Sequence, residues 1–242
     1  MTRTPDATPG LKRFYGDAAV VAAPDGTFGI TLDGAAAVTP GRNALAVPTR
    51  ALGDAIAAEW RAQGHTVDPQ SMPMTRLANT ALDRVAPNRA QIVSQVAAYA
   101  ASDLLCYRAV EPVDLVRRQA AAWDPLLAWA RTRFGCTLRT GAGVTFVAQD
   151  AAVVPSVTAA LDTLSFFRLT AVGTMAGITG SAVLAFALAE GRLGPRGAFD
   201  AAHLDELWNR ERWGFDAEAE ARGLAMAADL DAAKRFFDLA GD

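Results

Sequence analysis

The sequence has few of the residues on which metal binding and nucleophilic catalysis usually depend, with two cysteines and two histidines in 242 residues. Cys106 and Cys136 lie far apart, form no CxxC pair and have no histidine at ligand spacing, which excludes the usual zinc and thioredoxin-like sites. A triad built on His65 or His203 would require the fold to bring a serine or cysteine to it, so a structural role is favoured for both. We therefore expect no metal and no cofactor.

The chain also lacks an excess of positive charge. Its formal net charge is −3, whereas binding to nucleic acid requires clustered lysine and arginine to neutralise phosphates. Nucleic acid is therefore excluded as the main partner. Residues 1–16 carry charges and no apolar run, so we expect no secretory signal and a protein that stays in a reducing cytosol.

One long stretch lacks charge altogether. Residues 169–189 resemble a membrane span and include Gly173 and Gly177 at GxxxG spacing. The Thr-Gly-Ser of residues 179–181, however, is typical of a helix end followed by an N-cap serine. We expect two buried helices in contact and no stable membrane insertion, and a membrane-associated assembly factor remains an alternative.

The hydrophobic periodicity changes along the chain. Short β-type runs between residues 17 and 40 are separated by Pro24-Asp25-Gly26 and by Asp33-Gly34, which are hairpin signals, and a helix follows over residues 49–63. Later segments are almost wholly helical, with Pro112, Pro125 and Pro155 at expected helix starts. The pattern predicts an α+β protein: a small mixed α/β domain over residues 1–70, and a mainly helical domain over residues 71–242 with a short hairpin near 137–148.

Candidate catalytic groups are weak. Gly141 and Gly143 lack the third glycine of a dinucleotide fingerprint, and no segment matches a phosphate-binding loop with its lysine. An unrecognised small-molecule site near Asp103, Tyr107 and Arg108 stays open as an alternative, because polar groups that converge in a pocket would favour it.

Charged and aromatic residues of the central segment have a structural interpretation. Asp103 and Arg108 flank Leu-Leu-Cys, where a charge is buried only with a partner, so we expect both to be structural. The same role is expected for Trp123 and Asp124, and for Trp60, which would close the helix over residues 49–63 onto the small sheet.

The segment from residue 200 to residue 220 favours partner binding. It has seven acids against two arginines, a formal charge of −5. Trp213 lies between a predicted helix and a glycine, where an aromatic is typically half exposed and can anchor an interface. Glu206, Asp216 and Glu218 would supply negative charge around it, so we predict these four residues as a partner-binding site that steers a basic partner.

Several blocks, in order along nearly the whole chain, resemble one known family, the chaperones that assemble F-type ATP synthase. The blocks are Leu-Asp-Gly at 32–34, Glu-Trp at 59–60, Met-Pro at 72–73, Ser-Asp-Leu-Leu-Cys-Tyr-Arg at 102–108, Trp-Asp-Pro-Leu at 123–126, Thr-Gly-Ser at 179–181 and Trp-Gly at 213–214. The Asp-Leu-Leu-Cys-Tyr-Arg and Trp-Asp-Pro blocks are the most specific.

The resemblance implies a protein that is not an enzyme and binds no nucleotide or metal. It implies a small mixed domain followed by a helical domain. It further implies that the partner is the free alpha subunit of the catalytic head, whose beta-facing apolar surface is shielded until beta joins. A monomer is expected, in the bacterial cytoplasm or, for eukaryotic relatives, in the mitochondrial matrix.

Overall fold

A computed structural model describes residues 12–143, 145–214 and 217–241. These residues form two compact units, one comprising residues up to Arg84 together with Leu239–Gly241, the other running from Val85 to Asp238. The strands are β1 (Ala18–Ala22), β2 (Phe28–Leu32), β3 (Ala35–Ala36), β4 (Ala46–Val47), β5 (Tyr107–Arg108) and β6 (Gly141–Ala142). The helices are α1 (Arg50–Arg61), α2 (Pro73–Thr80), α3 (Arg89–Ala97), α4 (Val113–Phe134), α5 (Val153–Asp162), α6 (Phe166–Thr179), α7 (Ala182–Ala189), α8 (Pro195–Ala202), α9 (Leu204–Trp213) and α10 (Ala217–Leu239).

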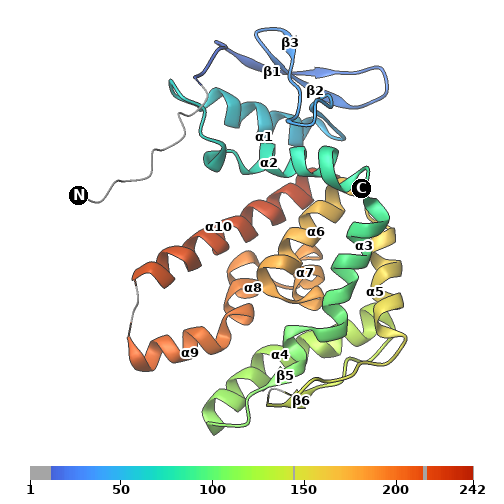
Figure 1. The fold of residues 1–242 in the computed structure, drawn as a ribbon, viewed down its shortest axis with the longest axis vertical. Helices are drawn as coiled ribbons and strands as arrows, with labels where there is room; N and C mark the ends of the chain where they lie inside the picture. Colours follow the sequence, from blue (N-terminus) through green and yellow to red (C-terminus); the bar gives the residue numbers. More distant parts are fainter. Residues whose placement is uncertain (1–11, 144, 215–216, 242) are drawn as a thin grey trace, which may run out of the picture. The chain divides into compact units, whose positions relative to one another are not determined.

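The first unit is an antiparallel sheet with a helix packed on it, as Figure 1 shows. β2 pairs with β1 along its whole length, and β3 and β4 pair with different parts of β2. The turn between β2 and β3 is the predicted Asp33-Gly34, and both residues have positive φ (49° and 83°), as a tight two-residue hairpin requires. Gly53 lets α1 approach β1 closely, because a Cβ there would lie only 3.0 Å from Val20 Cγ1.

The first unit extends to Arg84, beyond the boundary expected at residue 70, because α2 is fixed to α1. The Glu59 carboxylate, near the end of α1, accepts the backbone N–H groups of Met74 and Thr75 at 2.7 and 2.8 Å. These N–H groups lie in the first turn of α2 and have no partner within that helix, so Glu59 satisfies them and ties the two helices together.

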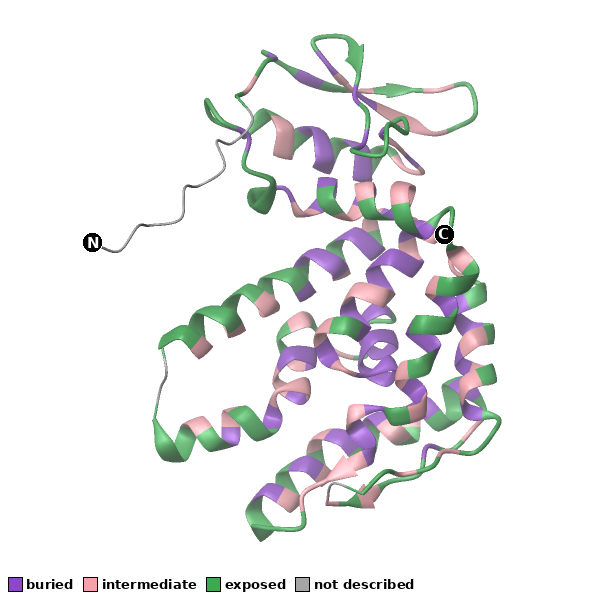
Figure 2. Ribbon diagram, in the orientation of Figure 1, coloured by how far each residue is buried: buried purple, intermediate pink, exposed green. Residues whose placement is uncertain are grey.

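The second unit is helical, and α7 is its centre. All eight residues of α7 are buried, in agreement with their uniformly apolar sequence (Figure 2). α6 ends at Gly180, with a φ of 65°, and the Ser181 hydroxyl then accepts the N–H of Leu184, which confirms the predicted break and N-cap. The two helices together match the uncharged stretch of residues 169–189. In the part of the chain that the structure describes, no helix is long and apolar enough to cross a membrane.

Two local expectations are wrong. Pro125 lies inside α4 and does not begin a helix. Over residues 137–148, the described residues do not form a hairpin: β6 pairs in parallel with β5, and the Gln149 side chain bonds the N–H and the carbonyl of Arg139. The α+β class and the order of a small sheet followed by a helical part are confirmed.

Candidate partner-binding site

The predicted partner-binding residues lie on α9 and at the start of α10. α9 ends at Gly214, which has a φ of 95°, a conformation that residues with a side chain rarely adopt. Trp213 is the last residue of α9 and is 84% exposed, the largest value among the exposed large apolar side chains of the described residues. The sequence predicted a half-exposed aromatic at this position, and the side chain is more exposed than that.

A hollow of about 500 Å³ lies between α8, α9 and the first part of α10. Its apolar lining includes Phe199, Leu207 and Met226, and Trp213 stands at its edge. The His203 ring stacks on Phe199 with a centroid distance of 4.3 Å. The hollow is therefore a surface of apolar and aromatic groups that a partner's side chains could cover.

Charged groups surround this hollow. Glu206 is exposed and lines it, together with Arg210 and Arg222. The Glu218 carboxylate, whose side chain is 81% exposed, accepts a hydrogen bond from Arg222 Nη1 at 2.7 Å. The structure thus gathers Glu206 and Trp213 at the hollow and connects Glu218 to it through Arg222, whereas Asp216 lies outside the described residues.

The first half of α10 is loosely held. Among its described residues from 217 to 229 none is buried, whereas Leu230, Phe236 and Phe237 in the second half are (Figure 2). Small residues make up much of the exposed half, and the exposed Leu224 adds apolar surface. A helix half with so little buried surface has low local stability and can adapt to a partner.

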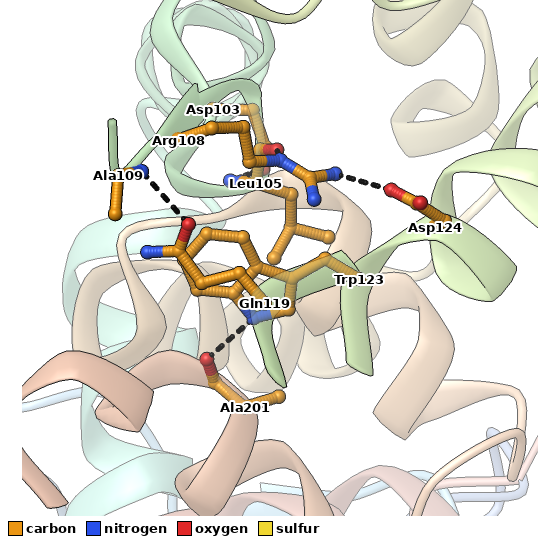
Figure 3. A network of polar contacts seen from close by, with 8 residues as sticks. All are labelled: Asp103, Leu105, Arg108, Ala109, Gln119, Trp123, Asp124 and Ala201. Atoms are coloured by element: carbon orange, nitrogen blue, oxygen red, sulfur yellow. Dashed lines mark hydrogen bonds and ion pairs between the residues drawn. The ribbon is translucent and has the colours of Figure 1, made fainter. Parts of the chain in front are cut away.

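Contacts from α4 fix the positions of α8 and α9, and Figure 3 shows those of Trp123 with Ala201 and of Gln119 with Ala109. The indole N–H of Trp123, which is buried, donates to the carbonyl of Ala201 at the end of α8, at 2.9 Å. The buried Gln119 side chain accepts the N–H of Ala109 at 2.8 Å and donates to Asp205 on α9 at 2.7 Å. Gln119 is one of the residues on which the family resemblance rests, but the sequence assigns it no role, since its partners are distant in sequence.

Arg108 and Asp124 form an ion pair, with Nη2 and Oδ1 separated by 2.8 Å (Figure 3). The Arg108 guanidinium also lies over the Trp123 ring, 5.1 Å from its centroid, and donates from Nε to the carbonyl of Leu105. These contacts connect β5 to α4 and support the structural role predicted for Arg108, Trp123 and Asp124.

Asp103 is fully buried and bonds groups other than Arg108. Its carboxylate accepts the Ser181 hydroxyl at 2.7 Å and the N–H groups of Leu105 and Val183 at 3.1 Å. Burial raises the pKa of Asp103 from 3.8 to about 6, although these hydrogen bonds favour the charged form. Asp103 thus joins two helix starts and has no exposed surface with which to contact a substrate.

Trp60 is half buried, not fully enclosed as expected of a core tryptophan. Its ring meets the Tyr15 ring edge-on with centroids 5.4 Å apart, and its backbone carbonyl accepts the Tyr15 hydroxyl at 2.8 Å. Trp60 thus connects the end of α1 to the segment that leads into β1.

Among the residues that the structure describes, no cluster of histidine, cysteine and acidic side chains could hold a metal ion.

An exposed tryptophan beside an apolar hollow, with charged groups of both signs around it, is typical of a protein that binds another protein. Comparisons agree with this class. Residues 12–131 match the model of the ATP12 chaperone protein family. The structure of Atp12 from Paracoccus denitrificans is 38% identical, with a TM-score of 0.90 over 95% of this chain and 98% of the other.

A point mutant of the Paracoccus protein matches with 37% identity and the same TM-score, 0.90, and the same shares of each chain, 95% and 98%. The Atu1473 protein from Agrobacterium tumefaciens is 40% identical, with a TM-score of 0.90 over 94% of this chain and 85% of the other. The chain belongs to the ATP12 family of ATP synthase assembly chaperones.

Proposed function

We propose that this chaperone binds the free alpha subunit of the F-type ATP synthase head and shields its beta-facing surface until beta arrives. The observation that carries the proposal is the 84% exposure of Trp213 at the edge of an apolar hollow, in a chain of this family. A monomeric subunit exposes apolar surface that associates indiscriminately, and a second apolar surface of limited area can cover it reversibly.

Arg210 and Arg222 line the hollow as well, but the exposed acids on the helices beside it favour a basic surface on the partner. Glu206 and Glu218 are exposed on the two helices that border it, and Glu220 is exposed nearby on α10. Exposed charges change the rate of encounter more than the final affinity, and salt screens them over about 8–10 Å at physiological ionic strength. Such a surface captures the subunit quickly and still allows release when beta competes for the same area.

The complete burial of Asp103 argues against the alternative, an enzyme with a small-molecule site. The alternative small-molecule site requires an accessible polar group at Asp103, Tyr107 and Arg108, but the Asp103 carboxylate is fully enclosed and the Arg108 guanidinium is paired with Asp124. Trp213 and Glu206, in contrast, are both exposed and can contact a partner.

The experiment mixes purified alpha subunit with the chaperone and follows both complex formation by size-exclusion chromatography with light scattering and the turbidity of alpha on warming. We expect a complex of one alpha with one chaperone monomer, suppressed turbidity, and release of the chaperone when beta is added. Purified beta alone is the control client. Binding of beta as tight as that of alpha, or no complex with alpha, would contradict the proposal.

A further inference from the structure

A second concave surface lies on the opposite side of α9 from the hollow. This groove, of about 470 Å³, is bordered by α4, α8 and α9. Leu207 and Arg210 line both the groove and the hollow, so α9 separates the two. The contacts of Gln119 and Trp123 described above fix the helices on either side, and the groove is therefore part of the folded surface.

Three of the residues that line the groove are small. Ala122 lies between Arg118 and Leu126 on α4, each four residues away, and Gly197 and Ala201 lie at the same spacing on α8. Residues four apart share one face of a helix, so α4 presents a row with a small residue at its centre and α8 presents a pair of small residues. A Cβ added at Gly197 would meet only Leu193, at ordinary contact distances of 3.6 and 3.9 Å, so the backbone packing itself does not require this glycine.

The size and shape of this groove suit a helix. From Arg118 to Leu126 the α4 row spans about 12 Å at 1.5 Å per residue, which is the length of about two helical turns. Leu193 and Leu207, which are partly exposed, also line the groove and supply apolar surface, whereas Leu126 and Leu204 are buried. An apolar ridge of side chains from a partner helix would find in the groove both small residues and apolar surface, as in helix-in-groove recognition.

The rim of the groove has more positive than negative charge: three arginines and two acids line it. Each acid already has an arginine, since Arg196 Nε lies 2.9 Å from Asp200 and Arg118 Nη1 lies 2.7 Å from Glu211. A guanidinium carries five N–H donors, so Arg118 and Arg196, whose side chains are 43% and 75% exposed, can each bond a further carboxylate.

We propose that the groove binds a short amphipathic helix of the client subunit, with leucine-like residues on one face and aspartate or glutamate at its edges. This inference rests on the proposed function: the client would contact Trp213 and the exposed acids of α9 and α10 with one segment, and the arginines of the groove with an acidic helix. α9 would then lie between two segments of the client, and these two contacts on different sides of one helix would fix the orientation in which the client binds.

Two variants test the groove in different ways. Ala122→Trp fills the groove without changing charge, and Arg196→Glu reverses a rim charge whose side chain is 75% exposed. Ala128→Trp is the control for the first, because Ala128 is exposed on another face of α4. Arg50→Glu is the control for the second, because Arg50 pairs with Asp54 in the same i, i+4 arrangement on α1, outside the second unit.

The affinity of purified alpha subunit for each folded variant is measured by calorimetry, after thermal unfolding has shown native melting. We expect Ala122→Trp and Arg196→Glu each to weaken binding about tenfold or more, with both controls equal to wild type. Wild-type binding with unchanged affinity in both groove variants would overturn the inference and leave the proposed function intact. Absence of wild-type binding would overturn both.

Light scattering of the chaperone alone tests whether a second copy of this chain, instead of a client helix, occupies the groove. A wild-type dimer that Ala122→Trp converts to a monomer would assign the groove to a second copy of this chain and would also overturn the inference. If the Ala122→Trp protein does not melt as the wild type does, Arg196→Glu and its control decide the result.

Discussion

Gln119 and Asp205 are 86 residues apart in sequence, and the side-chain amide of the first donates to the carboxylate of the second across 2.7 Å. The other end of the same amide accepts the N–H of Ala109 at 2.8 Å. A single buried side chain thus connects α4, the start of α9 and the segment after β5. The position of the partner-binding surface on α9 depends on this connection.

Removing the amide of Gln119 should destabilise the protein. Gln119→Leu keeps a similar length but leaves the N–H of Ala109 without its partner, at a cost of about 1–3 kcal/mol in the free energy of unfolding. Denaturant unfolding of the two proteins measures the difference. Gln91→Leu, at an exposed position of α3, is the matched control and should change stability by less than about 0.5 kcal/mol. Equal losses in the two variants would contradict the role of Gln119.

The buried carboxyl of Asp103 predicts a dependence of stability on pH. Because burial raises its pKa from 3.8 to about 6, the folded protein binds this proton more tightly than the unfolded chain does. The stabilising contribution is therefore fully present below about pH 4 and is lost as the pH rises through 6, a change of about 3 kcal/mol.

Asp103→Asn tests this, because asparagine has a similar shape and does not titrate. The difference in unfolding free energy between wild type and variant should shrink by about 2 kcal/mol from pH 4 to pH 7, since the unfolded chain is already partly ionised at pH 4. A difference that is constant over that range, or that grows with pH, would refute a raised pKa. At every pH the variant should be the less stable protein, since its amide N–H₂ replaces one of the acceptors used by Ser181, Leu105 and Val183.

Replacement by alanine should lower the stability of the protein at Trp60 but weaken partner binding at Trp213. Trp60→Ala removes a half-buried ring that packs on Tyr15, and should cost about 2–4 kcal/mol of stability, below the upper end for fully buried rings. Trp213→Ala removes an exposed ring and should leave the unfolding free energy within about 0.5 kcal/mol of wild type while weakening capture of alpha. A loss of stability in Trp213→Ala equal to that in Trp60→Ala would contradict the assignment of one to the fold and the other to the surface.

The sequence allowed much of the fold to be predicted where local chemistry decides it. Asp33-Gly34 specifies a tight turn and Ser181 specifies a helix start, because in both cases the residue itself satisfies the backbone. The prediction of a helix start at Pro125 was wrong. A proline fits the interior of a helix if the surrounding packing compensates for the lost hydrogen bond, and no local sequence pattern reveals that packing.

The candidate site was predicted in part, and for a physical reason. An exposed Trp213 follows from its position beside a glycine, and the acidic surface follows from composition. The hollow, the groove and the Gln119 bridge depend on how α4, α8 and α9 come together, and such contacts between residues far apart in sequence have no signature in a single chain. The same holds for Asp103, whose partners on α7 could not be identified beforehand.

The central claim, that the acidic and aromatic surface of α9 and α10 captures alpha, is tested most directly by the affinity of alpha for wild type and Glu218→Lys over a salt series. The Glu218 side chain is 81% exposed and its pair with Arg222 is a surface pair within one helix, worth only a few tenths of a kcal/mol, so both proteins should fold alike. Asp54→Lys makes the same charge change in a pair of the same i, i+4 spacing on α1 and serves as control. We predict that at low salt Glu218→Lys binds alpha about tenfold more weakly than wild type or the control, and that the gap closes as salt rises. Equal affinities of wild type and Glu218→Lys at low salt, with both proteins folded, would contradict the account.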